Sequence, residues 1–273
     1  MGIGWLVAIA AGAAAVWAYG RWFERRSLYH PRVRFAKTPA MVGLPFEEIR
    51  FVAEDAVLLH GWWIAAPDAP GTVLYCHGNG DNVGDLVDDA ATLHTCGWNV
   101  FLWDYRGYGQ SRGRPSEKGT YRDARAAYEV VRARHGGADR PPVLVIGRSL
   151  GGAVALYLAT RQPVSGLVLE SSFTSTPDLC RLYYPKLPAG LICRFRYPSL
   201  ERIRGLRVPL LVAHGRADDV VPFAHGRALY EAAPGPKRFV ELRGPHQEVG
   251  WAQTPEYLDA IANLAASVFP ARP

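Results

Sequence analysis

The feature that most limits the fold of this chain is an alternation of short, mostly apolar segments with longer segments of helical periodicity. Short apolar segments of this kind are typical of strands in a parallel sheet that helices cover on both faces. The expected strands are residues 47–53, 57–66, 72–76, 99–103, 143–146, 166–169, 210–213 and 238–242. The expected helices are residues 82–96, 117–135, 150–161, 223–233 and 255–269, with Asp81 and Ser116 as N-caps of the first two.

The sequence therefore predicts an α/β fold with a mainly parallel sheet in one domain of residues 45–270. The first two strands are separated by a tight turn at Glu54 and Asp55, so we expect them to pair antiparallel. A chain of 273 residues with 49% hydrophobic and 21% charged residues is not a disordered protein. Its four cysteines do not form a disulfide scaffold.

An uncharged apolar run, residues 2–20, precedes this domain. As a helix it would extend roughly 28 Å, close to the thickness of the hydrocarbon layer of a membrane. Trp5 lies near one end, and Trp17, Tyr19 and Trp22 lie near the other, as interfacial aromatic residues do. We expect residues 1–22 to be an N-terminal membrane-anchor helix. The alternatives are a cleaved signal peptide and an amphipathic helix of a soluble protein.

The positive charge of the chain lies directly after this run. Residues 21–37 carry six Arg and Lys side chains against Glu24 alone, a net +5 of the chain's total of +6. A basic cluster beside an apolar run indicates membrane lipid as a partner and argues against nucleic acid. Residues 23–44 are thus expected to form a basic juxtamembrane linker. By the positive-inside rule, the protein is a single-pass membrane protein with its main domain in the cytoplasm.

A candidate nucleophile lies between an expected strand and an expected helix. Residues 147–151 match G-x-S-x-G, follow the apolar run 143–146 and open the helix that starts at Leu150. In this context the turn exposes Ser149 Oγ at the end of the strand. A glycine-rich helix start that Ser149 merely caps is the structural alternative.

A serine hydroxyl needs a base, and the best candidate is His246, which follows the last expected strand. Asp218 follows an earlier strand and would orient the imidazole, giving the order Ser, Asp, His. Asp219 and Glu170 are alternative acids. We expect His214 and His225 to be structural, and His77 belongs to a different loop.

That loop, His77-Gly-Asn-Gly, directly follows the expected strand 72–76. The backbone N–H of Asn79 and that of Leu150 are positioned to form an oxyanion hole. A simple glycine turn is the alternative. No group of His, Cys or carboxylate residues has metal-ligand spacing, and no G-x-G-x-x-G follows a strand, so we expect neither a metal nor another cofactor.

The segment 171–208 interrupts the alternation and is rich in proline and aromatic residues. Insertions of this length are usually functional, so we expect an apolar cap over the site. Tyr183, Tyr184 and Phe195 are its candidate substrate-binding residues. Extra packing of the core is the alternative. Cys180 and Cys193 would pair only in an oxidising compartment.

The order of these motifs resembles the α/β-hydrolase superfamily. The resemblance rests on His77-Gly-Asn-Gly, Asp104-Tyr-Arg-Gly-Tyr-Gly-Gln-Ser, Gly147-Arg-Ser-Leu-Gly-Gly and His214-Gly-Arg-Ala-Asp-Asp. It is similar to the membrane-anchored branch that includes lysophospholipases and protein depalmitoylases. That branch often has Asn-Asp after the histidine, whereas Gln247 and Glu248 follow His246 here.

The resemblance implies a serine hydrolase of acyl esters or thioesters that works through an acyl-enzyme, with Ser149, Asp218 and His246 as its triad. Two other functions remain open. One is a catalytically silent binding protein at the membrane, and the other is a serine peptidase or amidase of the same fold. No oligomeric state is predicted.

Overall fold

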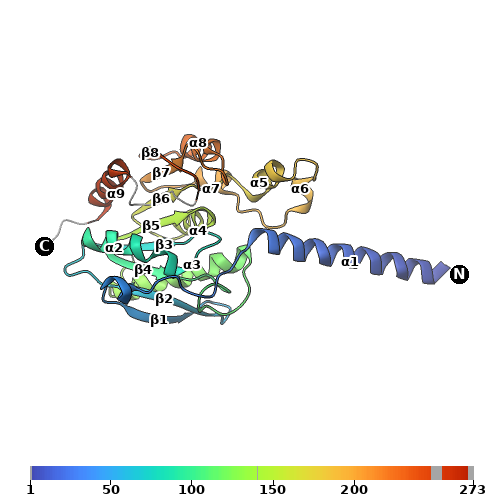
Figure 1. Cartoon of the computed structure of the whole chain (residues 1–273), viewed down its shortest axis with the longest axis horizontal. Helices are drawn as coiled ribbons and strands as arrows, with labels where there is room; N and C mark the ends of the chain where they lie inside the picture. Colours follow the sequence, from blue (N-terminus) through green and yellow to red (C-terminus); the bar gives the residue numbers. More distant parts are fainter. Residues whose placement is uncertain (1, 140, 247–253, 270–273) are drawn as a thin grey trace.

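The short apolar segments form one eight-stranded sheet (Figure 1). The computed structural model describes residues 2–139, 141–246 and 254–269. The strand order is β1-β2-β4-β3-β5-β6-β7-β8. β1 pairs antiparallel with β2 and β2 with β4, and every other pairing is parallel. The strands are β1 Glu47–Val52, β2 Leu58–Ile64, β3 Thr72–Cys76, β4 Asn99–Trp103, β5 Val143–Arg148, β6 Gly166–Glu170, β7 Leu210–Gly215 and β8 Lys237–Leu242.

Helices cover both faces of this sheet, as the sequence predicted. The helices α3, α4, α7 and α8 pack on one face, and α2 and α9 pack on the other. Their bounds are α2 Val87–Thr95, α3 Glu117–Arg134, α4 Leu150–Ala159, α7 Ser199–Ile203, α8 Phe223–Ala232 and α9 Pro255–Val268. The predicted boundaries at residues 1 and 270 lie outside the described residues, as do Gln247 and Glu248.

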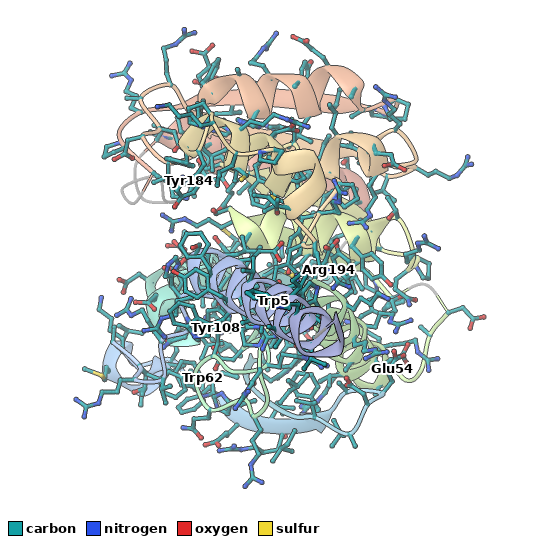
Figure 2. The ribbon with its side chains drawn as sticks, turned by 90° about the vertical axis from the view of Figure 1, so that its right-hand side faces the viewer. Trp5, Glu54, Trp62, Tyr108, Tyr184 and Arg194 are labelled. Carbon is teal, nitrogen blue, oxygen red and sulfur yellow. The ribbon has the colours of Figure 1, made fainter. Side chains whose placement is uncertain are left out.

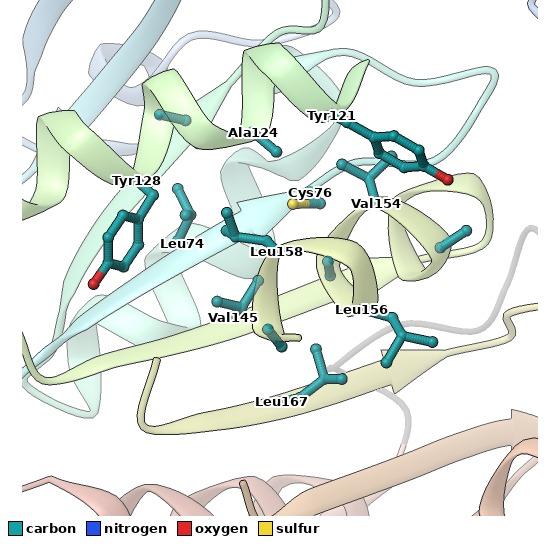
Figure 3. Close-up of a cluster of buried hydrophobic side chains, with 14 of the residues drawn as sticks. Leu74, Cys76, Tyr121, Ala124, Tyr128, Val145, Val154, Leu156, Leu158 and Leu167 are labelled. Carbon is teal, nitrogen blue, oxygen red and sulfur yellow. The ribbon is translucent and has the colours of Figure 1, made fainter. Parts of the chain in front are cut away.

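The domain has two hydrophobic cores, one on each face of the sheet, because successive side chains of a strand point to opposite faces. In β3, Leu74 and Cys76 point into the core beneath α3 and α4, whereas Val73 and Tyr75 point into the core beneath α2 and α9. Figure 3 shows the first core, where Leu158 of α4 lies among Leu74, Val145 and Tyr128. Because both faces are covered, the central strands are apolar at every position rather than at alternate ones.

The N-caps were predicted correctly for one helix and wrongly for the other. Ser116 accepts a hydrogen bond from the Gly119 amide and starts α3. Asn82, not Asp81, caps the helical segment before α2, and Asp85 completes a reciprocal capping box with it. That segment, Val83–Leu86, is a 3₁₀ helix, so α2 is shorter than the sequence indicated.

The insertion 171–208 divides into two parts. Helices α5 Thr176–Tyr183 and α6 Ala189–Ile192 form a cap with exposed apolar side chains, whereas Tyr197 and Ile203 are wholly buried in the core. The cap and the core-packing interpretations are therefore each correct for part of the segment. All four cysteines, including Cys180 and Cys193, are free thiols.

The N-terminal apolar run forms helix α1, Gly2–Leu28, which projects from the body of the molecule (Figure 1). None of the helices in the described ranges has both the length and the apolar character needed to cross a membrane. The predicted spanning anchor is therefore not supported. The predicted boundary after residue 22 is also wrong, because the helix continues for another turn and a half through Arg25 and Arg26.

The remainder of the basic linker is docked on the domain. Tyr29 is 3% exposed, and the side-chain amide of Asn82 donates hydrogen bonds to the carbonyl oxygens of Arg32 and Arg34. The ring of Phe35 packs edge-on against Trp62. The linker that follows α1 is therefore fixed to the domain by tertiary contacts.

The core beneath α4 gives a test of this packing. Leu158→Ala removes a side chain that is 0% exposed, so we expect the free energy of unfolding to fall by about 2–5 kcal/mol. Leu182→Ala, at a position that is 50% exposed in the cap, is the matched control and should change it by no more than about 0.5 kcal/mol. Urea unfolding followed by tryptophan fluorescence measures both. Equal effects of the two substitutions would contradict the packing described.

Candidate active site

Ser149 occupies a strained turn between β5 and α4. Its backbone has φ 52° and ψ −116°, a conformation that non-glycine residues rarely adopt. The turn is held by the Ser149 amide, which donates to the carbonyl oxygen of Glu170 at 2.8 Å. A side chain on Gly151 would lie 2.0 Å from the carbonyl oxygen of Cys76, so glycine alone allows α4 to approach the end of β3. This close approach lifts the serine side chain to the carboxyl end of the sheet.

His246 and Asp218 lie beside this serine. The Nε2 atom of His246 is 3.1 Å from Ser149 Oγ, and its Nδ1 atom is 2.8 Å from Asp218 Oδ2. Asp218 comes from the loop after β7 and His246 from the loop after β8. The structure thus brings together three side chains that are up to 97 positions apart in sequence. This is the arrangement in which an imidazole can take a proton from a hydroxyl while a carboxylate orients it.

Asp218 is held as a carboxylate. Burial opposes its ionisation, but hydrogen bonds from His214, His246 and the Val221 amide outweigh that effect and hold the pKa of Asp218 well below its usual range. Its Oδ1 atom accepts from the amides of Val220 and Val221 at 3.0 and 2.7 Å. The side chain is 0% exposed and His246 only 8% exposed, so water competes little with their hydrogen bond.

The alternative acids have other partners. Asp219 accepts a hydrogen bond from the backbone amide of His246 at 3.0 Å and so fixes the loop rather than the ring. Glu170 is buried and accepts hydrogen bonds from the hydroxyls of Tyr75 and Tyr257. Burial raises the pKa of Glu170. Asp218 is therefore the carboxylate that contacts the imidazole.

The three other histidines considered from the sequence, His77, His214 and His225, have partners other than the serine hydroxyl. His214 is wholly buried, and its Nε2 lies 2.8 Å from the carbonyl oxygen of Val221 and 3.4 Å from Asp218 Oδ2. His225 bonds to Thr174, and burial lowers its pKa. His77 is buried, with its ring against that of Tyr105.

The loop after β3 reaches the same site. Asn79 and Leu150 both line the cavity that contains Ser149 and His246. The side chain of Asn79 is held on two sides, because its Oδ1 accepts from the Tyr108 hydroxyl at 2.9 Å and its Nδ2 lies 2.9 Å from His30 Nδ1. The His30 backbone amide also donates to Asn79 Oδ1. These hydrogen bonds fix the peptide whose N–H was predicted to bind an oxyanion.

The cavity in front of Ser149 has a volume of about 770 Å³. Tyr183 and Tyr184 line it, with Leu179, Leu187 and Ile192 of the cap. Phe195 does not line it, which corrects the prediction that it binds substrate. It is 6% exposed and packs edge-on against the Tyr29 ring at 5.3 Å, because the chain turns inward after the cap.

Two features of the site were not anticipated from the sequence. The first is Arg148, whose guanidinium donates to the backbone oxygen of His246 at 3.2 Å and so positions the histidine loop. The second is α1, since Trp17, Phe23 and Glu24 are among the cavity-lining residues. Within the described ranges, no three His, Cys, Asp or Glu side chains gather as ligands for a metal ion.

Known proteins are similar in sequence to this chain over much of its length. Residues 67–195 match the family model described as serine aminopeptidase, S33. Rv2307c, an uncharacterized protein of Mycobacterium tuberculosis, is 36% identical over 265 residues, covering 96% of this chain and 91% of its own. The α/β-hydrolase domain-containing protein WAV2 of Arabidopsis thaliana is 32% identical over 288 residues, covering 93% of this chain and 92% of its own.

Solved structures share the fold. The Pyrococcus furiosus esterase Pf2001 has a TM-score of 0.72 at 21% identity and covers 89% of this chain and 98% of its own. The Rhodococcus esterase RhEst1 has a TM-score of 0.60 at 19% identity and covers 81% of this chain and 99% of its own. Together with the relatives that align over nearly the whole chain, they show that this protein belongs to the α/β-hydrolase family.

Proposed function

We propose that this protein is a serine hydrolase that cleaves carboxylic esters or thioesters of acyl groups. The observation that carries the proposal is the hydrogen-bonded series Ser149–His246–Asp218, which opens on a large cavity. The Pyrococcus and Rhodococcus proteins of the same fold are named esterases, which favours ester substrates. The apolar side chains of the cap favour an acyl chain as the bound part of the substrate.

The proposed reaction begins with nucleophilic attack. Ser149 Oγ transfers its proton to His246 Nε2 as it attacks the substrate carbonyl carbon. The carbonyl oxygen becomes an oxyanion, which accepts hydrogen bonds from the backbone N–H groups of Asn79 and Leu150. Asp218 accepts from Nδ1–H of His246, fixes its tautomer and stabilises the imidazolium that forms.

The intermediate then collapses and the acyl group remains on the serine. His246 gives its proton to the leaving alkoxide or thiolate, and the ester bond breaks. A water molecule next transfers a proton to His246 and attacks the acyl-enzyme. The second tetrahedral intermediate collapses and releases the carboxylic acid, while His246 returns its proton to Ser149 Oγ.

A serine peptidase or amidase of the same fold is the second candidate, and the name of the matching family model favours it. The same three residues would act on an amide, whose nitrogen must be protonated as it leaves. The apolar cap side chains Leu179, Leu187 and Ile192 favour an acyl chain over a peptide. Of the carboxylates that line the cavity, Glu24 is bound to Arg21 and to two backbone amides, whereas Asp81 is the group that could meet a peptide N-terminus. A catalytically silent binding protein is disfavoured by the intact hydrogen bonds between Ser149, His246 and Asp218.

Replacement of the nucleophile tests the proposed function. Ser149→Ala should lower kcat/KM for p-nitrophenyl esters by a factor on the order of 10⁴ or more, because no covalent intermediate can form. Labelling by a fluorophosphonate probe should be lost in the same variant. Ser267→Ala is the matched control, since Ser267 is exposed and its hydroxyl donates to the Leu264 carbonyl oxygen within α9.

Ester hydrolysis or labelling that persists in Ser149→Ala, with an unchanged melting temperature, would reject Ser149 as the nucleophile. Parallel assays with an octanoyl ester, an acyl thioester and an aminoacyl amide separate the candidate activities. Faster turnover of the amide would favour the peptidase.

The pH dependence of activity separates the roles of Asp218 and His246. Because its pKa lies well below the usual range, this carboxylate stays ionised under mildly acidic conditions. His246 must be neutral to act as the base, so activity is present at higher pH and is lost as the histidine gains a proton. We expect kcat/KM to fall about tenfold per pH unit on the acid side, with a one-proton slope. An activity that does not depend on pH, or an acid limb with a slope other than one proton, would contradict a single general base.

We further propose that α1 attaches the protein to membrane lipid on the cytoplasmic side. Trp5, Val7, Ile9 and Val16 on this helix are each more than 60% exposed, and Arg25 and Arg26 follow them. An exposed apolar helix next to basic residues is favoured at an anionic lipid surface. The family resemblance to a membrane-anchored branch supports the same placement.

A flotation assay with phosphatidylserine-containing vesicles tests this placement. Ile9→Glu puts a charge on the apolar helix and should weaken vesicle binding at least about tenfold. Val52→Glu is the control, because Val52 is an exposed apolar residue of β1. Equal flotation of the two variants would refute lipid attachment through α1.

A further inference from the structure

The C-terminal half of α1 forms part of the cavity wall. Trp17, Phe23 and Glu24 line the same cavity as Ser149 and His246. Trp17 is 61% exposed and Phe23 40% exposed, so both offer apolar surface that no other part of the described chain covers fully. Figure 2 looks along the helix from its N-terminal end, with Trp5 in front, Tyr184 of the cap above it and Tyr108 below it.

Glu24 fastens this part of the helix to the cap. Its Oε1 atom accepts hydrogen bonds from the backbone amides of Arg194 and Phe195 at 2.6 and 2.8 Å. Its Oε2 atom forms an ion pair with Arg21. Hydrogen bonds to a carboxylate are stronger than those between neutral groups. The Glu24 side chain is only 14% exposed, so water competes weakly for these hydrogen bonds.

Aromatic contacts support the same junction. The Phe23 ring meets Tyr184 of the cap edge-on at 6.4 Å, and the guanidinium of Arg21 lies 5.3 Å from the centre of the Phe195 ring. Beneath them the hydroxyls of Tyr29 and Tyr197 are 2.8 Å apart in the core. The end of α1 and the cap are therefore joined from the core outward, and they form one continuous wall.

We propose that α1 is the outer wall of the acyl-binding site and that it gives the enzyme a preference for long acyl chains. The inference rests on the proposed ester or thioester hydrolysis. A short acyl group bound to Ser149 stays beneath the cap, whereas a long chain extends toward Trp17 and Phe23. Burial of these side chains then contributes binding energy only to long substrates. Glu24 is a positioning residue, because it holds the wall against the cap without taking part in the chemistry.

The experiment compares butyryl and hexadecanoyl p-nitrophenyl esters in the same detergent, using the full chain. Trp17→Ala should lower kcat/KM for the long ester about tenfold and change it less than about twofold for the short one. Val52→Ala, at an exposed apolar position of β1 that does not line the cavity, is the control and should change neither. Trp17 is largely exposed, so its removal leaves the fold intact.

Glu24 variants test the positioning role. Glu24→Ala should reduce the long-to-short ratio by raising KM for the long ester while kcat for the short ester is retained. Glu24→Gln keeps an oxygen acceptor for the two amides and should preserve more of the ratio. A long-to-short ratio that is unchanged in both Trp17→Ala and Glu24→Ala would overturn the proposal, as would an equal change in Val52→Ala.

A binding assay separates this inference from the proposed function. Wild-type protein that cleaves neither ester would refute the hydrolase. The fluorescence of dansyl-undecanoic acid would still measure how tightly the full chain binds an acyl chain. Binding that weakens in Trp17→Ala but not in Val52→Ala would support α1 as an acyl-binding wall, and equal binding by both variants would refute it.

Discussion

The close approach of α4 to the end of β3 is the constraint on which the site depends. It requires Gly151 against the Cys76 carbonyl oxygen and a strained backbone at Ser149. The cost of that strain is carried by the two cores, which cover both faces of the sheet. Because the loops after β3, β5, β7 and β8 lie at the same edge of a parallel sheet, one local distortion places a hydroxyl within reach of residues from all of them.

The sheet and the position of the serine could be predicted from sequence because both depend on local patterns. The central strands are apolar at every position, and G-x-S-x-G lies between an expected strand and an expected helix. The hydrophobic pattern and the motif therefore predict the same fold. The sequence favoured Asp218 as the acid but left Asp219 and Glu170 as alternatives, so the choice stayed open. It depends on which carboxylate faces the imidazole, and adjacent residues such as Asp218 and Asp219 differ only in the direction of their side chains.

The contacts of α1 with the cap could not be predicted from the sequence, for a different reason. An uncharged run with flanking aromatic residues has the composition of a membrane anchor. Composition does not predict whether the same helix contacts the cap. The decisive contacts of Glu24 are with backbone amides of Arg194 and Phe195, which have no sequence signature. The one available signal was Glu24 itself, an isolated acid among basic residues. Phe195 was misjudged for the same reason, since its aromatic character does not reveal that it faces Tyr29.

Hydrogen bonds between His30 and Asn79 connect the segment after α1 to the loop after β3. The residue that leads from α1 into the domain also binds the side chain of the loop after β3. A shortened chain that begins at Leu44, chosen to isolate the sheet and its helices, would lose His30 together with the helix. Any change in its turnover would then mix two causes, the missing wall and a loosened oxyanion loop. Point substitutions within α1 keep these causes apart, whereas truncation merges them.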